Sequence, residues 1–246
     1  MPPYLSLVLP AFNEAAAIGQ TISEIVAWLE ARGLTYEIIV AADGSDGTRE
    51  VVREMARTNA RLRAIGHPER LGKGRGVREA VALAEGEIIG YADADNKVPI
   101  EEFAKLEPWL KEFPIVTGSR AIDRSLVERR QPLYRRLGSI GFHWFMHAAT
   151  GLWHITDSQC GFKFFRRDVA VNLFARQKID GYMFDVEILA LAQALGYVVK
   201  EVPIRWRDDG DSRLELVRGN LRNMRDVMRI RLLAGAAQRP SDRRQV

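Results

Sequence analysis

Short apolar segments of strand length alternate along this chain with segments in which apolar residues recur at helical spacing. The strand-like segments are residues 5–9, 37–41, 62–65, 87–92, 115–118, 161–166 and 197–203. Helical spacing covers residues 15–32, 46–57, 77–84, 100–112 and 184–195, and residues 124–156 are helical and mixed. Strands that alternate with helices across short loops indicate a mostly parallel sheet covered on both faces, so we predict an α/β fold.

Polar residues follow three of these strands at the points where the strands end. Asn13 and Glu14 follow the first strand, residues 43–46 follow the second, and residues 93–96 follow the strand at 87–92. In open α/β sheets, ligands bind at the carboxyl ends of the strands. We therefore expect the functional site at this edge of the sheet.

The sharpest motif is Asp93-Ala94-Asp95, at the end of an apolar strand. Two carboxylates two residues apart at a strand end can face one hard cation, and Mg²⁺ or Mn²⁺ prefers such oxygen ligands and usually bridges to phosphate. The alternative is that the pair merely caps the helix that begins near Pro99, because Asp favours turns and caps. The position after a buried parallel strand favours the cation site.

A glycine-rich basic loop, Leu71-Gly-Lys-Gly-Arg-Gly76, precedes a helix. Glycines allow the backbone to approach a phosphate closely, and Lys73 adds a positive charge. The spacing matches neither a Walker loop nor a dinucleotide fingerprint. The alternative is a flexible surface turn.

In their order along the chain, these motifs resemble those of the family 2 glycosyltransferases, which have the GT-A fold. The matching segments are Pro10-Ala-Phe-Asn-Glu14, Asp43-Gly-Ser-Asp-Gly-Thr48, Leu71-Gly-Lys-Gly74, Asp93-Ala-Asp95 and Gly118-Ser-Arg120. Asp157-Ser-Gln-Cys-Gly-Phe-Lys163 and Phe184-Asp-Val-Glu187 resemble the branch that glycosylates polyprenyl or dolichyl phosphate, most nearly the dolichyl-phosphate β-glucosyltransferases. The resemblance covers residues 5–216. It implies a Rossmann-like, mostly parallel central sheet flanked by helices, with amphipathic helices at the C-terminal end.

The resemblance also implies a division of the chain into functional parts. Residues 1–213 would form the GT-A glycosyltransferase domain, in which 1–119 bind the nucleotide-sugar and 120–213 bind the acceptor. Residues 214–237 would then form a basic amphipathic helix, and residues 238–246 a flexible tail.

Individual residues match the family's functional positions. Those matched to nucleotide-sugar binding are Pro10, Ala11, Asn13, Glu14, Asp43, Lys73, Asp93 and Ala94. Those matched to catalysis are Asp95, Arg120, Arg135 and Ser139, and those matched to the acceptor side are Asp157, Arg207, Ser212 and Arg213. Asp93 and Asp95 match the ligands of an Mg²⁺ or Mn²⁺ cofactor, and Asp43 matches a carboxylate that reads the base.

The implied reaction transfers glucose or mannose from UDP-glucose or GDP-mannose to a polyprenyl phosphate, dolichyl or undecaprenyl, with inversion at the anomeric carbon. A phosphate monoester is already anionic near neutral pH because its second pKa is about 6, so no strong general base is needed. The work falls to positioning and charge stabilisation, for which arginine forks suit phosphate oxygens. The alternatives are a glycosyltransferase with a soluble or cell-wall acceptor, and a basic nucleotide- or nucleic-acid-binding protein without transferase activity.

Some residues depart from the family pattern or leave a role open. Ala42 stands where the family usually has a further Asp, and the second loop is one residue shorter, which leaves the base specificity open. Lys97 lies two residues after Asp95. Its ammonium group would either weaken metal binding there or point away from the site. Asp157 could order the site or its arginines, and Glu187 could be a site residue or a buried structural carboxylate.

The positive charge is concentrated in two segments, 120–136 and 214–246, whose basic residues are all arginine. In the second segment an apolar stripe and an arginine stripe run side by side, about 100° apart on one helix. The apolar residues are Val217, Leu221, Met224, Met228 and Leu232, and the arginines are Arg218, Arg222, Arg225 and Arg229. Such a helix suits an anionic membrane surface, and the alternative is that it docks on its own domain.

Composition excludes several classes of protein. The single Cys160 excludes a disulfide scaffold and a Cys-based zinc site, and fits a reducing compartment. The sequence shows no secretory signal, no apolar run long enough to span a bilayer, and no recognisable nucleic-acid-binding module. We therefore expect a cytoplasmic protein held peripherally at the inner face of a membrane. Its expected partners are a nucleotide-sugar donor, a polyprenyl-phosphate acceptor and an anionic membrane surface. A separate membrane protein is a further possible partner, and nucleic acid is not expected to bind.

Overall fold

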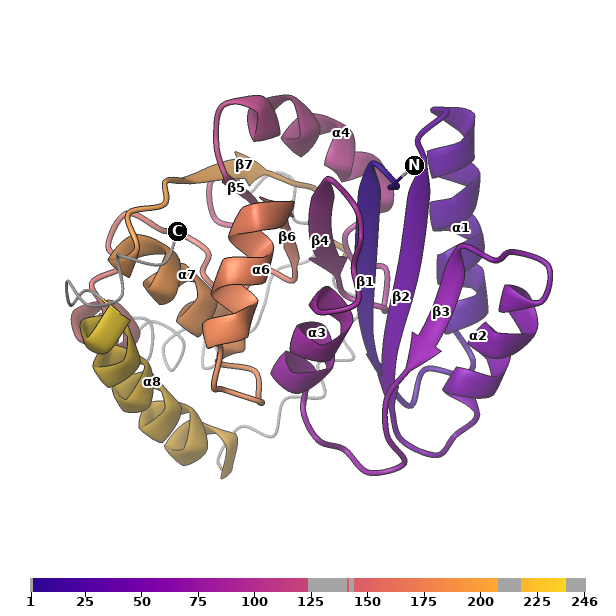
Figure 1. The fold of residues 1–246 in the computed structure, drawn as a ribbon. Coiled ribbons are helices and arrows are strands. Elements are labelled where there is room, and N and C mark those ends of the chain that lie inside the picture. The colour runs from indigo at the N-terminus through magenta and orange to yellow at the C-terminus, as the bar shows by residue number, and fades with distance from the viewer. Residues whose placement is uncertain (1, 124–140, 142–143, 208–217, 238–246) are drawn as a thin grey trace.

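The structure, a computed structural model, describes residues 2–123, 141, 144–207 and 218–237, and these residues fold around one seven-stranded sheet (Figure 1). The strands are β1 (Leu5–Phe12), β2 (Tyr36–Asp43), β3 (Leu62–Ile65), β4 (Ile88–Ala92), β5 (Ile115–Ser119), β6 (Phe162–Arg166) and β7 (Val199–Pro203). Their order is β3-β2-β1-β4-β6-β5-β7, and neighbours pair in parallel except that β6 runs antiparallel to β4 and β5. The predicted mostly parallel sheet is confirmed.

Helices cover both faces of this sheet (Figure 1). One face packs against α1 (Ile18–Ala31), α2 (Thr48–Ala56) and α4 (Phe103–Leu106), which lies between the 3-10 helices η1 (Ile100–Glu102) and η2 (Glu107–Lys111). The other face packs against α3 (Lys73–Val81), α6 (Arg167–Arg176) and α7 (Phe184–Ala194), and α8 (Arg218–Ala237) packs on α7. Within the described ranges, no helix combines the length and the apolar character that crossing a bilayer requires.

Side chains on successive strand residues point to opposite faces, and this alternation divides the apolar core in two. Leu5, Leu7 and Leu9 of β1 join the cluster beneath α1 and α4, whereas Val8 joins the cluster beneath α3 and α7. Because both faces are covered, the strand reads in the sequence as an apolar run in which Ser6 is the one polar residue.

Four helical segments differ from the prediction. Helix α3 begins at Lys73, four residues before the predicted start at Val77, so residues 73–76, expected in a loop, form its first turn. Residues 100–112 form η1, α4 and η2 in succession, and Pro108, which has no backbone N–H to donate, lies at the start of η2. The sequence predicts no element at α6, which follows β6 directly and begins with the polar Arg167 and Asp168. Of the mixed segment, residues 144–150 are helical and 151–156 are not, and most of the remainder lies outside the described residues.

The reversed strand β6 brings a distant part of the chain to the end of β4. Its register pairs Tyr91 with Lys163 and Ala92 with Phe162. Because β6 runs antiparallel, the residues before it lie beside those that follow β4, and Asp93 N–H donates to the Gly161 carbonyl at 3.1 Å. The carboxyl edge of the sheet is therefore built from both halves of the chain.

Candidate active site

Two carboxylates and two ammonium groups meet where β4 ends. Lys73 Nζ lies 2.6 Å from Asp93 Oδ1, and Lys97 Nζ lies 3.5 Å from Asp95 Oδ2. Burial and the neighbouring Asp93 carboxylate raise the pKa of Asp95 above its usual value. A Cβ built on Gly161 would lie 2.1 Å from Asp93 Oδ2, so only glycine leaves room for this carboxylate.

The Asp93 and Asp95 side chains fit a hard divalent cation. Both are partly open to solvent, with 43% and 41% of the side chain exposed, and their mutual repulsion shows that the pair favours added positive charge. In the described part of the chain, no group of three or more His, Cys, Asp or Glu side chains is arranged for a metal. A cation here would therefore take its other ligands from water and from a bound phosphate, as Mg²⁺ commonly does.

A buried carboxylate on α7, Asp185, stands behind Lys73. Asp185 Oδ1 accepts hydrogen bonds from Lys163 Nζ and from the Tyr91 hydroxyl, each at 2.5 Å, and Asp185 Oδ2 lies 3.9 Å from Lys73 Nζ. Burial alone would lower the pKa of Lys73, but Asp93 and Asp185 raise it above the usual value, so Lys73 stays charged. Sequence reasoning gave Lys163 and Asp185 no role, although a lysine within an aromatic strand signals a buried ion pair.

Arg120, directly after β5, is held in a fixed orientation by Asp157. Its Nε and Nη2 donate to the two carboxylate oxygens at 2.7 and 2.8 Å, and its backbone N–H donates at 3.0 Å. Burial alone would raise the pKa of Asp157, but Arg120 brings it below its usual value. The guanidinium also lies 5.5 Å from the ring of Trp206. Asp157 therefore orders an arginine, one of the two roles left open by the sequence.

Glu201 on β7, which the sequence analysis did not single out, holds Asp157 in turn. Its Oε1 accepts from the Asp157 backbone N–H at 2.9 Å and from the Thr156 hydroxyl at 3.0 Å, and its Oε2 accepts from the Thr156 N–H at 2.8 Å. No local sequence pattern marks such a contact, because its two sides are more than forty residues apart.

The loops after β1 and β2 are tied to each other. Asp46 accepts from the Ala15 N–H at 2.9 Å and from the Thr48 hydroxyl at 2.6 Å, and that hydroxyl accepts from the Glu14 N–H at 3.0 Å. Asn13 adopts a left-handed backbone conformation with φ of 55°. The predicted donor residues Pro10 to Glu14 thus lie at the carboxyl edge, beside the loop that carries Asp43; their roles stay predictions.

In the structure, the Asp43 carboxylate binds main-chain N–H groups. Its carboxylate accepts N–H groups from His67 at 3.2 Å, Leu71 at 2.8 Å and Gly72 at 3.3 Å. These bonds fix the segment that leads into residues 71–76. We keep the name glycine-rich loop for these residues, of which 73–76 form the first turn of α3. Recognition of the base by Asp43 stays a prediction. The neighbouring Ala42 is fully buried in the core.

The acceptor-side residues are only partly within the described chain. Arg207 N–H donates to the Lys97 carbonyl at 2.9 Å, which places Arg207 beside Asp95 in the fold. Ser139, Ser212 and Arg213, together with Arg135, lie outside the described residues.

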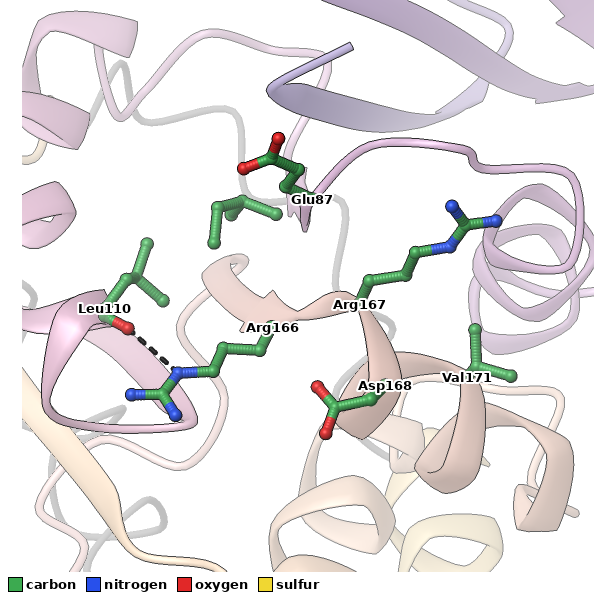
Figure 2. Close-up of a pocket in the computed structure, with 7 residues that line it drawn as sticks. Glu87, Leu110, Arg166, Arg167, Asp168 and Val171 are labelled. Carbon is green, nitrogen blue, oxygen red and sulfur yellow. Dashed lines mark hydrogen bonds between the residues drawn. The ribbon is translucent and has the colours of Figure 1, made fainter. Parts of the chain in front are cut away.

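A surface hollow of about 800 Å³ lies at the opposite end of the strands (Figure 2). Glu87, directly before β4, and Arg166, at the end of β6, line it together with Arg167. Arg166 Nε donates to the Leu110 carbonyl at 3.0 Å, and Arg167 Nη1 donates to the Glu85 carbonyl at 3.0 Å. Its arginines therefore serve the fold, and the hollow is not part of the candidate site.

The sheet order with one reversed strand, and the carboxylates at its carboxyl edge, define a GT-A glycosyltransferase fold. The chain belongs to glycosyl transferase family 2, whose family model matches residues 6–174.

Curated relatives extend this likeness over most of the chain. Dolichyl-phosphate beta-glucosyltransferase ALG5C of Trichomonas vaginalis is 38% identical over an alignment of 226 positions. The alignment covers 87% of this chain and 66% of that protein, slightly under two thirds of its length. The Homo sapiens dolichyl-phosphate beta-glucosyltransferase is 32% identical over 94% of this chain and 76% of its own length.

Solved structures share the fold at lower identity. Glucosyl-3-phosphoglycerate synthase from Mycobacterium tuberculosis, in complex with Mn²⁺, UDP-glucose and phosphoglyceric acid, is 21% identical with a TM-score of 0.66, over 95% of this chain and 80% of that one. Mannosyltransferase PcManGT from Pyrobaculum calidifontis, in complex with GDP-Man and Mn²⁺, is 18% identical with a TM-score of 0.56, over 96% and 74%.

Proposed function

We propose that this protein is an inverting hexosyltransferase that moves glucose or mannose from UDP-glucose or GDP-mannose to a polyprenyl phosphate. The observation that carries the proposal is one sheet edge that holds Asp93 and Asp95 beside Lys73, together with the Arg120 fork on Asp157. The curated relatives' names favour glucose as the sugar and dolichyl phosphate as the acceptor. Family membership favours a transferase over the nucleic-acid-binding alternative.

The donor would lie over the carboxyl ends of β1, β2 and β4. Asp93 and Asp95 would hold a divalent cation there, and Lys73 would add its charge beside them. When bound, the cation neutralises the nucleoside diphosphate that leaves. Mn²⁺ accompanies nucleotide-sugars in two solved neighbours, which supports a divalent ion and leaves the choice between Mg²⁺ and Mn²⁺ to experiment.

The acceptor phosphate would approach from the side of Arg120. Asp157 engages two of the five N–H groups of the Arg120 guanidinium, and among the described residues no other hydrogen bond to that guanidinium competes with phosphate oxygens. Arg207 would assist, as would Arg135, Ser139, Ser212 and Arg213. The chemical step needs no protein base because the attacking oxygen is anionic. Residues 1–119 and 120–213 are thus proposed as donor and acceptor halves, although they share one sheet because β6 inserts between β4 and β5.

Helix α8 supports a peripheral contact with an anionic membrane. Val227 and Ile230 are fully buried against the domain, so the helix does dock. The predicted apolar stripe nevertheless faces outward, with Met224, Met228 and Leu232 exposed by 42%, 47% and 74%. Arg222, Arg225 and Arg229 are exposed beside this stripe. An apolar face flanked by arginines suits anionic lipid, and we place the protein at the inner face of a membrane.

The test is a donor panel of UDP-glucose, UDP-galactose and GDP-mannose against dolichyl and undecaprenyl phosphate, with Mg²⁺, Mn²⁺ or chelator. We expect a lipid-linked hexose that forms only with a divalent ion. The same donors with 3-phosphoglycerate test the alternative of a soluble acceptor. A panel that yields no lipid-linked sugar with any donor would contradict the proposal.

A further inference from the structure

The connection between α6 and α7, residues 177–183, packs directly on the glycine-rich loop. Arg75 N–H donates to the Asp180 carbonyl at 3.2 Å, and Gln177 Nε2 donates to the Gly74 carbonyl at 2.9 Å. Arg78, on α3, adds an ion pair to Asp180 Oδ1 at 2.7 Å. The position of the loop that carries Lys73 is therefore set by this connection.

Two glycines of the loop make this packing possible. A Cβ built on Gly72 would lie 2.3 Å from the Asp180 carbonyl oxygen, and one built on Gly74 would lie 2.5 Å from the Ile179 carbonyl oxygen. Both distances are far below a van der Waals contact with backbone. These glycines thus admit a neighbouring main chain, in addition to the phosphate approach that the sequence suggested.

Glu187 holds the α6–α7 connection from the other side. Its two carboxylate oxygens accept the backbone N–H groups of Lys178 and Ile179, each at 2.8 Å, and the residue is fully buried. Gln177 Nε2 also donates to the Ile179 carbonyl at 2.8 Å, which closes the connection on itself. A buried carboxylate with both oxygens on backbone N–H groups fixes main chain, and neither of these contacts involves a described residue assigned to the candidate site.

The same helix also holds the lysine itself. Asp185, two residues before Glu187 on α7, places Oδ2 at 3.9 Å from Lys73 Nζ. The first turns of α7 therefore set the main chain of the loop through Glu187 and the ammonium group of Lys73 through Asp185.

We propose that Glu187 is a positioning residue for donor binding: it fixes the α6–α7 connection, which fixes the glycine-rich loop and with it Lys73. The proposal rests on the proposed function, because the anion that Lys73 would meet is the diphosphate of the donor. Glu187 acts through Lys73 and touches no substrate.

The test compares Glu187→Gln with Glu37→Gln in calorimetric titrations with UDP and GDP in the presence of Mn²⁺. Glu37 is a matched control because its carboxylate accepts from the Ser6 hydroxyl and the Glu85 N–H at the far end of the sheet. We expect Glu187→Gln to weaken nucleoside-diphosphate binding about tenfold, because one backbone N–H loses its acceptor. The donor KM should rise by a similar factor and the acceptor KM should not move, and Glu37→Gln should change neither.

Lys73→Met distinguishes an effect of Glu187 on the position of Lys73 from a general loss of stability of the fold. If Glu187 acts through Lys73, the double variant binds UDP within about twofold of Lys73→Met alone. A full tenfold further loss in that background, or a parallel rise in acceptor KM, overturns the proposal.

If Glu187→Gln does not fold, Asp180→Ala provides a second test at a partly exposed residue of the α6–α7 connection. It removes the ion pair with Arg78, which helps to hold the connection against α3, so we expect about a threefold loss of UDP affinity. Unchanged affinity counts against the proposal. A wild-type protein that binds neither UDP nor GDP contradicts the proposed function as well. A wild-type protein that binds UDP, with a folded Glu187→Gln that binds equally well, contradicts the positioning role alone.

Discussion

Lys163 on β6 and Asp185 on α7 form a buried ion pair at 2.5 Å, with 0% and 4% of their side chains exposed. The pair joins the reversed strand to the helix that stands behind Lys73. The hydroxyl of Tyr91 and the carbonyls of Ser158 and Cys160 complete the hydrogen bonds of the two charges. Because both charges are satisfied, neither can lose its partner without a large cost.

Lys163→Met should therefore destabilise the fold by about 3 kcal/mol, since the buried Asp185 carboxylate would lose its close ammonium partner and keep only Lys73 at 3.9 Å. The midpoint of urea unfolding measures this change. Arg53→Met, which breaks a fully surface-exposed pair with Glu50, is the control and should shift stability by less than about 0.5 kcal/mol. Equal shifts in the two variants would show that the buried pair contributes no more than a surface pair.

Asp95→Asn should abolish metal-dependent transfer and keep the fold intact. The raised pKa of Asp95 shows that the folded state disfavours its charge, so removal of that charge does not lower the thermal midpoint at neutral pH. Mn²⁺ binding, followed by electron paramagnetic resonance, should weaken at least tenfold. Retained metal-dependent activity would refute the assignment of Asp95 as a ligand.

Asp157→Asn should misorient Arg120, because the guanidinium loses its bidentate carboxylate partner. We expect kcat/KM for the acceptor to fall about a hundredfold, through a lower kcat and a higher acceptor KM. The donor Kd should stay unchanged. A loss confined to donor binding would place Asp157 on the other side of the reaction.

Acid should remove the stability that Asp157 contributes. Because its folded pKa lies below its usual value, the contribution is complete above the unfolded carboxyl pKa of about 3.9 and is lost as the pH falls through the folded pKa. Urea midpoints measured from pH 7 to pH 3 should show wild type and Asp157→Asn converging in acid. A gap of constant size over that range would contradict this linkage.

Met224→Glu combined with Met228→Glu should weaken flotation with vesicles that contain anionic lipid, because two acids replace the exposed apolar stripe of α8. UDP binding should stay at the wild-type level. Val171→Glu, at an exposed apolar position on α6, is the matched control and should float as wild type does. Undiminished flotation of the double variant would exclude this face as the lipid contact.

The sequence predicts the strands well because both faces of the sheet are covered, which makes the central strands β1, β2 and β4 mostly apolar. It does not predict α6, because the helix begins with Arg167 and Asp168 and its apolar spacing is weak. Nor does it predict that β6 inserts between β4 and β5, since that depends on pairing between distant segments.

The same limit applies to the site. Motifs mark Asp93, Asp95 and Arg120, which lie at strand ends in recognisable contexts. The acids around the site differ in this respect: Asp157 and Glu187 lie in matched motifs that leave their contacts open, and Glu201 lies in no motif. Glu201 and Glu187 bind backbone N–H groups, which every residue but proline carries, so no side-chain pattern at the partner position reveals the contact.

The close packing of main chain against Gly72 and Gly74 has a consequence for protein engineering. A phosphate-binding loop is often treated as a cassette that can be grafted between scaffolds. Here the shape of the loop is complementary to the carbonyls of Ile179 and Asp180, which come from a different part of the chain. A graft of residues 71–76 alone would lack these carbonyls, so the smallest transferable unit includes the α6–α7 connection, residues 177–183.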